Sequence, residues 1–200
     1  MTSLQKWGKS VRTTIPVMAG YLVLGAGFGI LLRTRGYGLG WALAMSAFIY
    51  AGSMQYVAID LLTGGASLLT TAVTTLLVNA RHLFYGISML ERYRAAGKYA
   101  PYLIFSLTDE TYSLVAARED LTGAECFRIS LLDQLYWVLG TALGSLAGAY
   151  LDFNTTGIDF SLTALFLTVF TEQWLETKNH APALIGLGVS IVCRLLFGAD

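Results

Sequence analysis

Tyr50-Ala51-Gly52-Ser53-Met54-Gln55-Tyr56 lies in the middle of an apolar run that extends from Gly38 to Thr63. A run of this length would be a membrane helix on hydropathy alone, yet its centre holds glycine, serine and glutamine where a lipid-facing helix carries Leu, Ile or Val. We therefore predict that the helix is broken there. A break in hydrocarbon leaves backbone N–H and C=O groups unpaired, so it persists only where protein, water or a ligand supplies their hydrogen bonds.

The predicted break makes Ala51 to Gln55 the first candidate binding site. The N-terminus of a half-helix that begins near Ser53 carries a partial positive charge and unpaired N–H donors, which suit a substrate carboxylate. Gly52 would permit close approach, and Gln55 could add a donor. The alternative is a continuous helix whose small residues let a neighbour pack closely and whose glutamine bonds across the interface.

Composition points to a membrane protein. Hydrophobic residues make up 55% of the 200 residues, and charged residues make up 13%. Soluble domains contain about 25% charged residues, so this chain cannot cover itself with polar surface. The 13 basic and 13 acidic residues cancel, which removes any case from bulk charge for binding nucleic acid. Cys126 and Cys193 have no CxxC spacing and indicate no redox compartment.

The apolar segments predict an all-α, polytopic membrane helix bundle. We expect about six to seven hydrophobic segments, at least one of them broken or re-entrant, in a single transmembrane transport domain over residues 1–200 with a cytoplasmic tail at 1–14. No cleavage site follows the first segment, so it is a retained span rather than a signal peptide. GxxxG faces, which allow close helix contact in lipid, occur at Gly25/Gly29 and Gly140/Gly144/Gly148. The segments are 15–32, 38–63, 68–90, 101–117, 128–151, 160–175 and 183–197.

The basic residues favour a re-entrant hairpin at 38–63. A single crossing there would put the basic N-terminus and the basic loop 92–98 on opposite sides, whereas the positive-inside tendency places both in the cytoplasm. Two half-helices of about 13 residues reach roughly 20 Å each and can turn back near the midplane. Similar spacing in 38–56 and 157–174 also suggests a three-element repeat, with 101–117 as its linker.

Ionisable residues inside the apolar segments are candidates for function. Each costs about 2.5 to 3.5 kcal/mol on insertion scales and so requires a partner or a role. Asn79 and His82 share a helix face, whereas Arg81 points about 100° away. His82 is either a titrating group, with an unperturbed pKa of about 6.5, or a hydrogen-bonded packing residue. The whole set comprises Asp60, Arg81, His82, Asp109, Glu110, Asp133, Glu172 and Arg194.

Asp109 and Glu110 are the most central acids. We assign Glu110 a coupled proton and Asp109 either the substrate ammonium or an ion pair with Arg81, because adjacent like charges push their proton affinities apart. The two roles could be reversed, and Glu172 is the reserve candidate. The alternative is a set of interior ion pairs that holds helices in register. No metal is expected, because neither histidine has further ligands at a suitable spacing.

Four stretches of sequence occur together. They are Ala51-Gly52-Ser53-Met54-Gln55, then Asn79-Ala80-Arg81-His82-Leu83-Phe84-Tyr85-Gly86, then Leu107-Thr108-Asp109-Glu110, and finally 158–166 with Glu172-Gln173-Trp174. In this order they resemble the AzlC family of branched-chain amino acid exporters. The resemblance implies a multi-pass protein of the bacterial inner membrane that exports valine, leucine, isoleucine and related amino acids, methionine included. It also implies a small, separately encoded AzlD-like membrane subunit as partner, and further apolar sequence after Phe197.

Two other classes of function compete with a transporter. A membrane-embedded hydrolase using His82 with Glu110 should show HExxH, GxSxG or another assembled nucleophile, and the sequence contains none. A structural or assembly subunit would not need broken helices. No Walker motif or nucleotide site is present, so we expect no cofactor and export driven by an ion gradient, most economically of protons. Unmatched charges at Arg33, Arg81 and Arg194, together with the GxxxG faces, predict a surface for another subunit.

Overall fold

The computed structural model describes residues 2–116, 118, 120–150 and 178–197, with 157, 160, 163–164, 167, 170–171 and 174–175 between them. The chain divides into two compact units, 1–158 and 159–200, and each is described by itself. Every regular element in the described residues is a helix, which confirms the all-α prediction. Whether residues 1–200 act as one transport domain stays a prediction.

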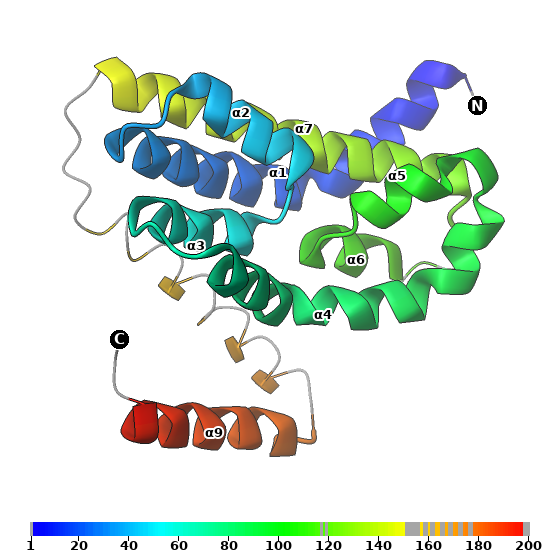
Figure 1. Cartoon of the computed structure of the whole chain (residues 1–200). Coiled ribbons are helices and arrows are strands. Elements are labelled where there is room, and N and C mark those ends of the chain that lie inside the picture. The colour runs from blue at the N-terminus through cyan, green and yellow to red at the C-terminus, as the bar shows by residue number, and fades with distance from the viewer. Residues whose placement is uncertain are drawn as a thin grey trace. The chain divides into compact units, whose positions relative to one another are not determined.

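Helices α1 (Ser3–Thr34) and α7 (Gly123–Tyr150) run parallel and in contact along most of their length (Figure 1). Their glycine faces pack against each other. A Cβ atom at Gly25 would lie 2.8 Å from the carbonyl oxygen of Trp137, and one at Gly140 would lie 2.8 Å from that of Leu22. The predicted GxxxG faces are therefore covered within the chain and give no argument for a partner subunit.

The predicted break is present, and the chain reverses at it. α2 (Leu39–Phe48) ends before Ile49–Ala51, and α3 (Gly52–Thr63) begins directly after them. Tyr50 has φ +43°, in the left-handed region that non-glycine residues seldom adopt. α3 then runs back beside α2, so both outer ends of this hairpin lie at the end of α1 that carries Thr34 (Figure 1).

A second hairpin follows, which the sequence analysis did not predict. α4 (Leu68–Ala95) and the short helix η1 (Gly97–Tyr99) lead to α5 (Ala100–Phe105), a break at 106–108, and α6 (Asp109–Ala116). The prediction of one apolar segment over 101–117 is thus wrong, whereas its role as the linker of a repeat stays a prediction. The physical reason is a helix start: Thr108 Oγ1 accepts a hydrogen bond from the backbone N–H of Thr111 (3.3 Å), and two acids occupy the first turn.

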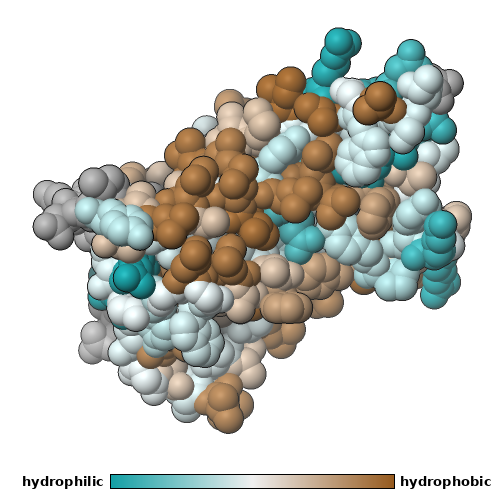
Figure 2. All heavy atoms as spheres, turned by 90° about the horizontal axis from the view of Figure 1, so that it is seen from above, coloured by the Kyte–Doolittle hydropathy of each residue, from teal (hydrophilic) through white to brown (hydrophobic). Residues whose placement is uncertain are grey.

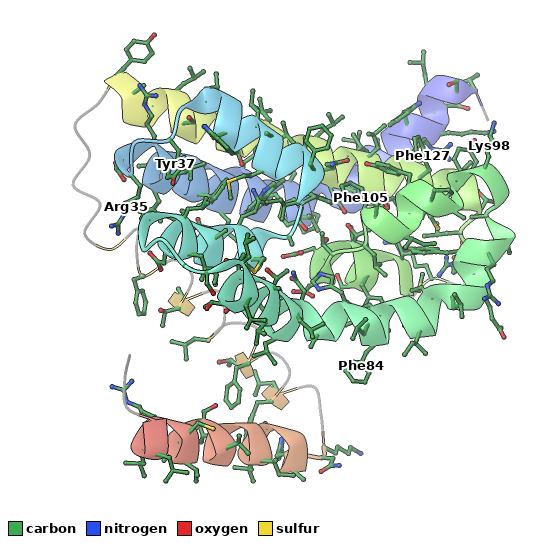
Figure 3. The ribbon with its side chains drawn as sticks, viewed as in Figure 1. Arg35, Tyr37, Phe84, Lys98, Phe105 and Phe127 are labelled. Atoms are coloured by element: carbon green, nitrogen blue, oxygen red, sulfur yellow. The ribbon has the colours of Figure 1, made fainter. Side chains whose placement is uncertain are left out.

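The two hairpins enter from opposite ends of the α1–α7 pair, and their turns meet in the middle. Tyr50 from the first turn and Phe105 from the second have ring centroids 6.3 Å apart. Figure 3 shows Arg35 and Tyr37 at one end of this unit and Lys98 and Phe127 at the other. The repeat predicted between 38–56 and 157–174 falls largely outside the described residues.

One described helix, α1, combines the length and the apolar composition needed to cross a membrane, while α2 and residues 183–196 of α9 (Ala181–Phe197) are shorter apolar helices. The number of crossings stays a prediction. Apolar side chains gather across the middle of the face seen in Figure 2, with hydrophilic ones toward its right-hand end. Several large apolar side chains on α2 and α7 are exposed: Trp41, Phe48, Leu135, Leu139, Leu143 and Leu146.

Candidate functional site

The candidate site lies where the second halves of the two hairpins begin. α3 starts at Gly52 with no side chain capping its first turn. α6 starts at Asp109, directly after the other break. The first N–H groups of a helix have no partner within the helix, so each start is a centre of partial positive charge.

Arg81, on α4, connects these two helix starts. Its Nη2 donates to Ser53 Oγ at 2.7 Å and lies 2.9 Å from Asp109 Oδ2. The structure therefore contains the ion pair that was one of the two arrangements considered for Asp109. The Arg81 side chain is 26% exposed and that of Asp109 24%, so the pair is reachable by a small molecule.

Asn79 and His82 lie on α4 near this ion pair. The carbonyl oxygen of the Asn79 side chain is buried and has no hydrogen-bond partner. The His82 Nδ1 atom is 3.3 Å from the backbone oxygen of Asn79, and its ring packs edge-on against Tyr85. These contacts fit the packing alternative for His82, whereas the unused acceptor of Asn79 is available to a ligand donor.

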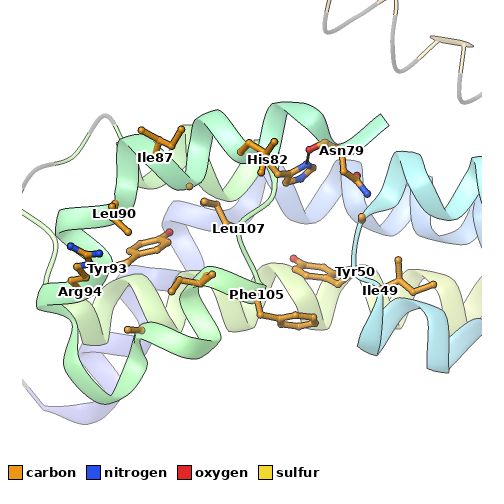
Figure 4. A pocket seen from close by; sticks show the side chains of 15 residues that line it. Ile49, Tyr50, Asn79, His82, Ile87, Leu90, Tyr93, Arg94, Phe105 and Leu107 are labelled. Atoms are coloured by element: carbon orange, nitrogen blue, oxygen red, sulfur yellow. Dashed lines mark hydrogen bonds between the residues drawn. The ribbon is translucent and has the colours of Figure 1, made fainter. Parts of the chain in front are cut away.

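A cavity of about 580 Å³ opens beside the first break. Figure 4 shows it between α4, α5 and the turn that carries Tyr50, with Asn79 and His82 at one end and Tyr93 and Arg94 toward the other. Most of the remaining wall is apolar: Ile49, Leu83, Ile87, Leu90, Ile104, Phe105 and Leu107. The cavity has the size and the apolar character typical of small-molecule sites, which span about 300 to 1,000 Å³.

Gly52 and Gln55 have structural surroundings in this conformation. A Cβ atom at Gly52 would lie 2.9 Å from the indole ring of Trp137, so the glycine allows that ring to pack against the helix start. The Gln55 side chain is fully buried, donates to Ser46 Oγ (3.0 Å) and accepts from Trp137 Nε1 (2.8 Å). Both residues therefore pack against Trp137 at the break, and neither lines the cavity; their role in binding substrate stays a prediction.

Glu110 is held away from the Arg81 pair. Its Oε2 accepts from the hydroxyl of Tyr21 at 2.7 Å, so the two adjacent acids do face different partners, as predicted. Glu172, the reserve candidate, lies outside the described residues. Arg194 is exposed on α9.

Asp133 is one of the ionisable candidates of the sequence analysis, which assigned it no specific role. It lies on α7 with no exposed surface, and its Oδ2 accepts from Thr111 Oγ1 at 3.0 Å. Its other oxygen is buried without a partner. Asp133 is the one acid in the sequence 128–151, and an acid inside an apolar segment could have indicated a role in the site. In the described part of the chain, no three His, Cys, Asp or Glu side chains gather as metal ligands.

Comparison with known proteins identifies the family of the chain. Residues 16–151 match the family model described as AzlC protein. The chain is 46% identical over 192 residues to the branched-chain amino acid transport protein AzlC of Bacillus subtilis, covering 94% of this chain and 75% of that protein. It is 44% identical over 191 residues to an uncharacterized membrane protein of Helicobacter pylori, covering 94% and 84%, and 27% identical over 188 residues to the inner membrane protein YgaZ of Escherichia coli, covering 88% and 77%.

The fold and these relatives define a helical membrane protein. More particularly, the chain belongs to the AzlC family, as the four stretches of sequence predicted. No solved structure matches it.

Proposed function

We propose that this chain is the main subunit of a proton-coupled secondary transporter that exports branched-chain amino acids across the bacterial inner membrane, with several crossings and a small AzlD-like partner subunit. The observation that carries the proposal is the Arg81–Asp109 ion pair at the meeting point of two broken helices. Asn79 and His82, neighbours of Arg81 on α4, line a largely apolar cavity, and the pair itself does not. The name of the Bacillus subtilis relative supports the choice of substrate.

An α-amino acid can replace the internal ion pair charge for charge. Its carboxylate would bind Arg81 and the free N–H groups at the start of α3, and its ammonium would bind Asp109 and the unused Asn79 oxygen. Because a zwitterion adds no net charge, the low-dielectric interior stays neutral when it enters. The apolar wall formed by Ile49, Leu83 and neighbouring residues would then receive a branched side chain.

The other two classes of function are supported less well. A hydrolase would need His82 and Glu110 together, yet His82 contacts Tyr85 and the Asn79 backbone, while Glu110 bonds Tyr21. An assembly subunit gives no reason for two interrupted helices whose turns meet in the interior. Breaks of this kind in membrane proteins typically line a binding site or a pathway.

The decisive experiment measures counterflow of radiolabelled valine in proteoliposomes, with and without an AzlD-like subunit. We expect exchange that leucine and isoleucine inhibit and that alanine and lysine do not, because a large apolar side chain gains more contact with the apolar wall than a methyl group, and a charged side chain loses its water there. Inside-out vesicles with an imposed pH gradient test the direction of net transport. Equal inhibition by all four amino acids would contradict the assignment of substrate.

A further inference from the structure

A continuous row of hydroxyl groups connects two carboxylates in the core. Tyr21 Oη is 2.7 Å from Glu110 Oε2 and 2.7 Å from Thr108 Oγ1. Thr108 Oγ1 is 3.2 Å from Thr111 Oγ1, which in turn is 3.0 Å from Asp133 Oδ2. Four hydrogen bonds therefore link the two acids through three hydroxyls, on α1, at the second break and on α6.

The number of hydrogens in this row fixes its protonation. Three hydroxyls supply three hydrogens for four links, so one link is empty when both carboxylates are ionised. One added proton fills every link, whichever carboxylate holds it, because each hydroxyl can rotate to point the other way. A second added proton would have no acceptor in the row. All four links of the row are thus filled when the two acids hold one proton between them.

The surroundings of the row also favour a single added proton. Thr108, Thr111 and Asp133 are buried, and two ionised acids in the same low-dielectric region would repel. The titratable groups that face the row are phenols and the neighbouring ion pair: Tyr50 at the first break, Tyr102 on α5, and Asp109 with Arg81. The Arg81 charge is matched by Asp109, so it does not stabilise a second anion in the row.

We propose that Glu110 and Asp133 share one proton and that the row of hydroxyls carries it between them, which makes Asp133 a second proton-binding site. The inference rests on the proposed proton coupling and extends it. In the transfer, Glu110 gives its proton to Tyr21, each hydroxyl passes its own proton to the next oxygen, and Thr111 delivers one to Asp133 Oδ2. Four protons each shift by one link, the net result is the transfer of one proton from Glu110 to Asp133, and no electrons are exchanged. Each of the three hydroxyls then donates in the opposite direction.

The sharing can be tested without transport. Infrared spectra of the chain in lipid, recorded across a pH series, report protonated carboxyl groups by their C=O stretch. We expect one such band in the unmodified chain at neutral pH, and its loss in both Glu110→Gln and Asp133→Asn. Each amide can donate to the row as the protonated acid does, so the remaining acid is left ionised. A band that persists in either variant would overturn the sharing.

Transport measurements test the relay itself. Tyr21→Phe removes one hydroxyl and leaves both carboxylates in place, so valine counterflow should persist while pH-driven accumulation is lost. Tyr56→Phe is the matched control, because its phenol donates to the backbone oxygen of Leu24, away from the row. Thr111→Val, with the buried Thr14→Val as control, should repeat the pattern. Unchanged pH-driven accumulation in Tyr21→Phe and Thr111→Val would overturn the relay.

The two measurements separate this inference from the proposed function. If the infrared band behaves as expected but the unmodified chain shows no pH-driven transport, the shared proton stands and proton coupling fails. If pH-driven transport is present and the band is insensitive to one of the acids, proton coupling stands and the sharing fails.

Discussion

At the scale of single residues, Arg81 affects both the packing of the broken helices and the proposed binding of substrate. One guanidinium joins the start of α3, through Ser53, to the start of α6, through Asp109. It therefore holds two interrupted helices together with a contact that a zwitterion can replace. The side chain that stabilises this arrangement is thus the one that we expect to recognise substrate.

This double role predicts different outcomes for stability and for binding. Arg81→Gln leaves the Asp109 carboxylate without its charge partner, and since the pair is a quarter exposed we expect a cost of about 2 kcal/mol, below the roughly 3 to 5 of a fully buried pair. Adding Asp109→Asn should restore most of the thermal stability in detergent. Valine binding should stay absent in both variants, and a double variant that binds valine normally would contradict the substrate assignment.

Sequence reasoning located the polar residues of the core but not their partners. Asp109 and Glu110 were separated correctly because adjacent residues on a helix point in different directions. Gln55 was expected to face substrate, and only the three-dimensional arrangement brings Trp137 and Ser46 to it. Asp133 was among the candidates but received no role, because its hydroxyl partner, Thr111, is distant in sequence.

At the scale of elements, the sequence around each break explains why the first break was predicted and the second was not. Polar and small residues inside a long apolar run revealed the first break. The second occupies a short segment, where Ser106, Leu107 and Thr108 interrupt two helices of 6 and 8 residues. Threonine followed by two acids is a helix-start pattern that could have revealed it.

Because α1 packs closely against α7, we expect Gly→Ala to have opposite effects on stability at two positions of α1. A methyl group at Gly29 would overlap the backbone of Thr141, whereas nothing lies within 4 Å of a Cβ at Gly20. Gly29→Ala should destabilise by about 1 to 3 kcal/mol, and Gly20→Ala should be neutral or stabilise by about 0.5 to 1 kcal/mol. Thermal unfolding in detergent measures both, and similar midpoints for the two variants would argue against the parallel pair.

The start of α7 predicts a pH dependence of stability. The backbone N–H and the hydroxyl of Thr122 hydrogen-bond to the Glu125 carboxylate, and with Lys9 at 3.5 Å they hold its pKa below the ordinary value. A lowered pKa in the folded state stabilises above the unfolded value of about 4.3, and this contribution is lost as pH falls through the folded pKa. Glu125→Gln should therefore lose less stability on acidification than the unmodified chain. Glu91→Gln, at an exposed position on α4, is the control.

At the scale of the whole first unit, 1–158, the two hairpins determine which loops share a side. Each hairpin returns to the end from which it entered, so α1, α4 and α7 are the helices that connect the two ends among the described residues of this unit (Figure 1). One end carries most of the basic side chains, and the positive-inside tendency predicts that this end faces the cytoplasm. These residues are Lys6, Lys9, Arg92, Arg94, Lys98 and Arg118, against Arg33 and Arg35 at the other end.

This arrangement predicts which side of the membrane single cysteines face. With Cys126 and Cys193 replaced by serine, Gly40→Cys and Thr63→Cys mark the two outer ends of the first hairpin, and Ala95→Cys marks the end of α4. All three positions are exposed. We expect a membrane-impermeant thiol reagent to label the first two from the periplasmic side and the third only in inside-out vesicles. Labelling of Gly40→Cys and Thr63→Cys from opposite sides would mean that residues 38–63 cross the membrane once, and the turns of the two hairpins could not then meet at a site near its middle.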